Sequence, residues 1–166
     1  MKYSNKKNFI FYNIQNIIVI LVPLLSISIF TRIFSPEQYG LLALAILFGN
    51  ISSTIINFGF HNAYETFYFK CENKNKKEEL FNTLISFNII TFLALLIPIY
   101  FFIDTICYLF NVSKVNSEIF LFGYLACNLH TINNYFLLKA RNEKDSVLNS
   151  IFKIGIIVFQ FLFSII

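Results

Sequence analysis

Five apolar stretches divide the sequence, and polar, often charged segments separate them. A helix crosses roughly 30 Å of hydrocarbon with about 20 mostly apolar residues, and candidate stretches lie at residues 10–31, 38–60, 81–103, 117–138 and 150–166. This pattern predicts an all-α fold, a polytopic bundle of transmembrane helices with the bilayer as solvent. The fifth stretch reaches the last residue before it is long enough to span, so we expect a chain that is cut short.

The composition agrees with a membrane protein. Hydrophobic residues make up 57% of the chain and charged residues 13%, whereas about 25% of the residues of ordinary soluble domains are charged. A soluble core cannot hide this much apolar surface. The N-terminal MKYSNKK and the apolar run after it resemble a signal peptide, but the run is too long and no small-residue cleavage site follows it. We therefore expect this run to remain as the first span.

The basic residues indicate the orientation, because short cytoplasmic loops carry the excess of Lys and Arg. With a cytoplasmic N-terminus, all but two of the 13 Lys and Arg residues lie inside, and the exceptions are Arg32 and Lys114. The inside loops are also the longer ones, which explains part of this excess, but the density of basic residues favours the same orientation. Because these residues are split among short loops, they form no basic stripe of the kind that binds nucleic acid. We expect a multi-pass membrane protein without a nucleic-acid partner.

Cysteine and tyrosine add little about function. Cys71, Cys107 and Cys127 have neither metal-ligand spacing nor a disulfide framework, so we expect no metal site and no cofactor. Several tyrosines, Tyr64 and Tyr135 among them, lie near predicted span ends, where amphipathic rings prefer the headgroup layer. They support the span boundaries and say nothing about a substrate.

The connections between the predicted spans differ in length. Only a few residues around Pro36 separate the first two spans, which predicts a helical hairpin. Proline suits the first turn of the second helix, and Ser35 is placed to cap that helix. The longer gap at residues 61–80 contains CENKNKKEEL, which we interpret as a solvated cytoplasmic connection.

Polar side chains inside the predicted spans are informative, because a polar group in hydrocarbon costs free energy unless it finds a partner or faces a wet cavity. On the second span they recur at steps of three and four residues and so share one helical face; they are Asn50, Ser53, Thr54, Asn57 and His61, continuing to Glu65. The simpler explanation is that each hydrogen-bonds to a neighbouring helix. A stripe along most of a helix is harder to explain by packing alone, so we favour a water-accessible wall that faces a substrate.

The first and fourth spans carry further polar positions. Asn16 lies in the cytoplasmic third of the first span beside Asn13 and Gln15, and Asn128 begins a polar run in the fourth span that continues with His130, Thr131, Asn133 and Asn134. We include Asn16 and Asn128 among the candidates for contact with a substrate.

Three other residues each have two interpretations. Pro23, near the middle of the first span, either kinks the helix or serves as a hinge of the kind found in transporters. Arg32 either anchors the helix at the headgroups or holds a phosphate or another anion with its planar, always-charged fork. His61, with Glu65, has the chemistry to relay protons, but both lie near the cytoplasmic interface, where ionisable groups cost little. We favour that role less.

Catalytic chemistry is not indicated. The chain has no nucleophile–base grouping and no glycine-rich phosphate loop, which argues against an integral-membrane polysaccharide polymerase or acyltransferase. None of the nine acidic residues lies deep in a predicted span, which disfavours an ion-coupled drug exporter. A noncatalytic scaffold subunit is expected to have helix faces dominated by small residues and few aligned amides. We therefore expect a protein that is not an enzyme.

Residues 23–69 combine several short motifs in a fixed order. A proline-containing span is followed by Thr31-Arg32, by the run Ser35-Pro36-Glu37-Gln38-Tyr39-Gly40, and then by Phe58-Gly59 with an Ala-Tyr-Glu segment after it. This region resembles the N-terminal region of bacterial polysaccharide flippases, members of the multidrug/oligosaccharidyl-lipid/polysaccharide exporter superfamily. The resemblance covers a little over a quarter of the chain.

The resemblance implies the first, six-helix lobe of a two-lobed transporter. Such proteins move an undecaprenyl-diphosphate-linked oligosaccharide across the bacterial cytoplasmic membrane by alternating access, for O-antigen or capsule biosynthesis. The partners it implies are this substrate, membrane lipids and other membrane proteins of polysaccharide assembly. Arg32, on the family's Arg-before-Ser-Pro-Glu pattern, would contribute to a cationic surface for the diphosphate or an acidic glycan. Because the chain ends within the fifth span, we expect it to be inactive alone; the alternatives are a multidrug exporter of the same fold and the membrane enzyme.

Overall fold

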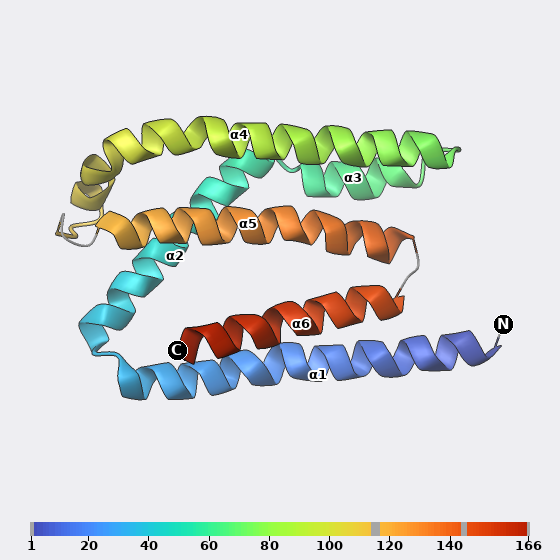
Figure 1. Ribbon diagram of the computed structural model, residues 1–166, viewed down its shortest axis with the longest axis horizontal. Helices are drawn as coiled ribbons and strands as arrows, with labels where there is room; N and C mark the ends of the chain where they lie inside the picture. The colour runs from blue at the N-terminus through green and yellow to red at the C-terminus, as the bar shows by residue number, and fades with distance from the viewer. Residues whose placement is uncertain (1, 114–116, 144–145, 166) are drawn as a thin grey trace. The chain divides into compact units, whose positions relative to one another are not determined.

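The computed structural model describes residues 2–113, 117–143 and 146–165, and these residues form helices and short connections without strands (Figure 1). In chain order the helices are α1 (Lys2–Ile33), α2 (Pro36–Asn57), α3 (Phe60–Tyr68), α4 (Lys74–Leu109), α5 (Ser117–Asn142) and α6 (Ser146–Ile165). The predicted all-α membrane bundle is confirmed. The chain divides into two compact units, Met1–Pro36 with Leu137–Ile166, and Glu37–Phe136.

Three helices of the described part are long and apolar enough to cross a membrane: Asn13–Ile33 within α1, Pro36–Asn57 and Lys74–Leu109. α4 has 36 residues and, at about 1.5 Å per residue, is roughly 54 Å long. It exceeds the hydrocarbon thickness, so at least one of its ends extends past the bilayer. α5 and α6 overlap the two remaining predicted spans, and their passage through the membrane stays a prediction.

The first unit is built on α1 and α6. The two helices pack along each other and run in the same direction (Figure 1). α1 is continuous across Pro23, so the role of this proline as a hinge stays a prediction. Gln15 is buried on α1. After the connection to α6, the Asn149 amide nitrogen donates a hydrogen bond to the carbonyl oxygen of Leu137 at 3.1 Å.

The junction of α2 and α3 differs from the sequence prediction. The polar stripe was expected to continue on one helix to Glu65, but α2 ends at Asn57. Phe58 and Gly59 have φ angles of 46° and 75°, in the left-handed region that residues other than glycine seldom adopt. Two such residues in succession stop the helix. The prediction of a single helical face that reaches Glu65 is therefore wrong.

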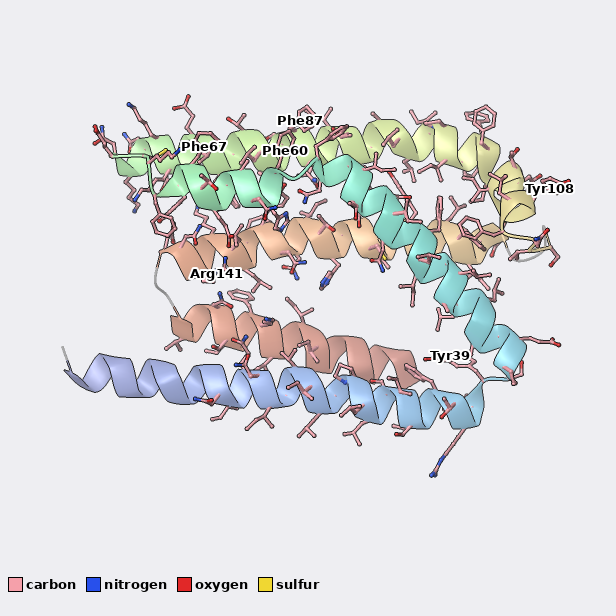
Figure 2. The ribbon with its side chains drawn as sticks, turned by 180° about the vertical axis from the view of Figure 1, so that it is seen from behind. Tyr39, Phe60, Phe67, Phe87, Tyr108 and Arg141 are labelled. Atoms are coloured by element: carbon pink, nitrogen blue, oxygen red, sulfur yellow. The ribbon has the colours of Figure 1, made fainter. Side chains whose placement is uncertain are left out.

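The segment beyond this junction is more helical than expected. Most of the gap at residues 61–80 belongs to α3 and to the first turns of α4, and only residues 69–73 connect them. α3 packs on α4 through aromatic rings, and Figure 2 shows Phe60 beside Phe87. These two rings meet edge-on with centroids 5.0 Å apart, and Tyr64 meets Phe81 at 5.8 Å. Aromatic packing against α4 thus orders the part of this gap that forms α3, whereas the charge run at residues 71–80 is mostly exposed.

In the second unit α2 and α5 approach each other very closely. A Cβ atom placed on Gly49 of α2 would lie 2.7 Å from Sγ of Cys127 on α5, and closer still to the carbonyl oxygen of Gly123. A Cβ on Gly123 would in turn overlap the carbonyl of Ala45. On α2, Ala45, Gly49 and the buried Ser53 recur every four residues, the spacing that allows helix backbones to pack closely in membranes. Ser53, expected on the polar wall, lies instead on the buried face of α2.

Candidate functional site

Three polar side chains meet at the α2–α3 junction. Oδ1 of Asn57, the last residue of α2, accepts a hydrogen bond from the hydroxyl of Tyr135 on α5 and lies 3.1 Å from Nδ1 of His61 on α3. The rings of His61 and Tyr135 also pack together, with centroids 4.1 Å apart. We call Asn57, His61 and Tyr135 the junction cluster. It brings together two residues that the sequence predicted for the site and one that it did not.

The hydrogen bonds of the junction cluster fix its chemistry. An amide oxygen only accepts, so Nδ1 of His61 carries the proton and Nε2 is left as an acceptor. Burial lowers the pKa of His61, because the protonated imidazole loses hydration. The imidazole is therefore neutral at pH 7. An uncharged set of donors and acceptors suits the hydroxyl groups of a ligand better than an anion.

A second polar feature lies on the exposed side of α2. Asn50 and Thr54 are both exposed, and the hydroxyl of Thr54 donates to the backbone oxygen of Asn50 at 2.8 Å. We call these two residues the exposed polar face. Asn57 follows Thr54 within one turn, so the polar stripe runs unbroken from Asn50 to the junction cluster. Exposure is common to positions that face lipid and positions that face a cavity, so the predicted wet wall stays a prediction.

The exposed polar face is bordered by apolar side chains that are also exposed. Ile51 and Ile55 are 48% and 55% exposed, beside Asn50 and Thr54 in the sequence. α2 therefore presents an amide and a hydroxyl next to an aliphatic strip. This arrangement can bind a polar group on one side of the helix and remain in contact with lipid on the other.

The remaining predicted residues lie elsewhere. Asn128 is buried on α5, where its amide nitrogen donates to the carbonyl oxygen of Tyr124 at 2.8 Å. Asn16 and Arg32 are exposed on α1, in the first unit. Arg32 is in the last turn of α1, where the helix dipole favours a positive charge. Among the residues that the structure describes, no group of three or more His, Cys, Asp and Glu could hold a metal ion.

Two residues of interest were missed in the sequence. Tyr135 was assigned only to the headgroup layer, although it follows Asn128 and Thr131 at steps of three and four residues and so shares their helical face. Asn88 is buried at 1% exposure on α4. It is an amide within the long apolar stretch at residues 81–103. A polar residue among apolar neighbours was the sequence signal that could have identified it.

A family model whose description is "Polysaccharide biosynthesis protein" matches residues 6–166. The chain belongs to this family. Membership supports a role in polysaccharide synthesis or export, and together with the three apolar helices it identifies a membrane protein. It also confirms the family resemblance drawn from residues 23–69. Searches of curated proteins and of solved structures find no match.

Proposed function

We propose that the chain is part of a transporter that flips an oligosaccharide linked to undecaprenyl diphosphate across the bacterial cytoplasmic membrane. Such a substrate has an apolar tail that belongs in the bilayer and a polar head that does not. A carrier must therefore provide hydrogen-bonding groups beside a lipid-facing surface. The observation that carries this proposal is the stripe on α2, in which Asn50 and Thr54 are exposed beside aliphatic residues and lead to the junction cluster.

The proposal gives the polar residues distinct roles. Asn50, Thr54 and the free acceptor of His61 bind sugar hydroxyls. Arg32, exposed at the end of α1, binds the diphosphate, because a guanidinium pairs with phosphate through two parallel hydrogen bonds. The protein moves its substrate between leaflets and makes or breaks no covalent bond. Membership in the polysaccharide biosynthesis family supports the choice of a glycan as substrate.

A scaffold role gains no support from the small-residue face of α2. Ala45 and Gly49 are buried against Gly123 and Cys127 of the same chain. A face that is already filled by α5 is not available for docking of another subunit. Small residues here explain how the lobe packs, and the exposed side of α2 is the side that carries the amide and hydroxyl.

Replacing both members of the exposed polar face, Asn50→Leu with Thr54→Leu, is expected to reduce surface glycan strongly. Two lost hydrogen bonds at about 0.5–1.5 kcal/mol each correspond to roughly 5- to 150-fold in transport rate. The measurement is surface polysaccharide in cells, compared at matched membrane abundance of the protein. The control is Ile51→Leu with Ile55→Leu, which keeps the aliphatic strip. Unchanged glycan in the first variant would remove these residues from the substrate path.

A further inference from the structure

One buried amide lies on α4 and another on α5, apart from the junction cluster. Asn88 and Asn128 are each 1% exposed. Among the described residues, neither Oδ1 nor Nδ2 of Asn88 has a hydrogen-bond partner, and Oδ1 of Asn128 has none. Nδ2 of Asn128 donates to the carbonyl oxygen of Tyr124; since only the NH₂ group can donate, that bond fixes which end of this amide is the oxygen. Three buried polar atoms are therefore unpaired.

Two aromatic contacts define how α4 and α5 are aligned. Phe92 stacks on Tyr124 with ring centroids 5.5 Å apart, and the Tyr124 hydroxyl donates to the Phe92 carbonyl oxygen at 2.7 Å. Phe81 meets Phe136 at 5.4 Å. Passing from the first contact to the second means moving toward the N-terminus of α4 and toward the C-terminus of α5. The two helices are therefore antiparallel.

This alignment places the two amides opposite each other. Asn88 precedes Phe92 by four residues on α4, and Asn128 follows Tyr124 by four residues on α5. One turn along each of two antiparallel helices leads to the same level. The unpaired atoms thus lie at one level of the two helices, one turn from the stacked Phe92 and Tyr124.

The unpaired atoms match the hydrogen bonds of one water molecule. An unpaired buried amide loses the hydrogen bonds that it would make with water, and buried polar groups in native proteins are nearly always paired. A buried water usually makes about three hydrogen bonds to otherwise unpaired groups. Here the two oxygens of Asn88 and Asn128 can accept both hydrogens of a water, and Nδ2 of Asn88 can donate to its oxygen.

We propose that Asn88 and Asn128 form a binding site for a single ordered water that bridges α4 and α5. The water adds to the hydrogen bond that Tyr124 donates to the Phe92 carbonyl oxygen, and it satisfies both amides without a direct bond between them. This site is independent of the substrate proposed above, because neither amide is exposed.

Hydroxyl-radical labelling of the purified protein by X-ray radiolysis tests the water site. Radicals formed from a bound water attack the side chains beside it, so Phe92 is expected to be oxidised although it is only 7% exposed. Phe120 is the matched control, because it is a buried phenylalanine, 0% exposed, with Phe48 and Phe110 as its ring neighbours. Mass spectrometry of the peptides measures oxidation at both positions.

We expect oxidation of Phe92 to exceed that of Phe120 clearly in the natural sequence. In the variant Asn88→Leu with Asn128→Leu, it should fall to the level of Phe120. Equal oxidation of the two rings in the natural sequence would overturn the proposal without any variant. This is the result expected if the two amides pair directly, because no water then lies beside Phe92. Oxidation of Phe92 that persists in a folded double variant would also overturn it.

Discussion

The variant Gly49→Ala is expected to destabilise the helix bundle, whereas Gly40→Ala on the same helix is expected to stabilise it slightly. Inserting one methyl group at Gly49 places it against the backbone of Gly123 and the sulfur of Cys127. A backbone carbonyl cannot turn away as a side chain can, so α2 and α5 must move apart. Overpacking of this kind costs about 1–3 kcal/mol, and here we expect the upper part of that range.

Gly40 is the matched control for this prediction. It also lies within α2, but a Cβ there would meet nothing within 4 Å. In that setting alanine is the better helix former, by up to about 1 kcal/mol. The measurement is the midpoint of thermal unfolding of each purified variant under the same conditions. Midpoints that move in the same direction by similar amounts would contradict the close packing of α2 on α5.

The variant Asn57→Leu is expected to have the second largest effect on stability. It removes the acceptor shared by Tyr135 and His61. The hydroxyl of Tyr135, a residue that is 0% exposed, then has no acceptor for its proton. A buried donor left without a partner costs about 1–3 kcal/mol. The measurement is again the midpoint of thermal unfolding, with Asn50→Leu as the control, since that amide is exposed.

A second substitution separates the hydrogen bond from a general loss of packing at the same place. Tyr135→Phe deletes the donor that Asn57→Leu leaves unpaired. The effects of two substitutions on stability do not add when both residues belong to one hydrogen-bond network. The double variant should therefore be clearly more stable than the sum of the two single effects predicts. Strict additivity would show that Asn57 and Tyr135 stabilise the protein independently, and that the junction cluster is not one hydrogen-bond network.

The sequence was a reliable guide to the helical character of the chain. Apolar stretches of the right length predict helices wherever the bilayer is the solvent, and each predicted stretch falls largely within a helix of the described part. The first turn of α2 was also predictable, because Pro36 is tolerated at the start of a helix and seldom within it. The division at Phe58 and Gly59 was not, because a glycine near the end of an apolar run does not by itself reveal two successive left-handed residues.

The candidate site was predicted only in part, for a related reason. Periodicity placed Asn50, Thr54 and Asn57 on one side of α2, and they remain on one side. Periodicity gives a face, however, and not the neighbour that covers it. Ser53 is buried and Tyr135 joins the junction cluster because the small residues of α2 bring α5 within reach. That contact links residues far apart in the sequence, which a reading of one helix at a time does not reveal.

We propose that the exposed polar face of α2 meets water while its aliphatic neighbours meet lipid, and thiol accessibility distinguishes these two environments. Once the natural cysteines Cys71, Cys107 and Cys127 are replaced, single variants Asn50→Cys, Thr54→Cys, Ile51→Cys and Ile55→Cys are treated with a charged, membrane-impermeant thiol reagent. The reagent is applied from each side of the membrane in turn, and labelling is measured by mass shift. We predict rapid labelling at positions 50 and 54 and little at positions 51 and 55. Equal labelling at all four positions, or none at 50 and 54 from either side, would show that this side of α2 does not face water.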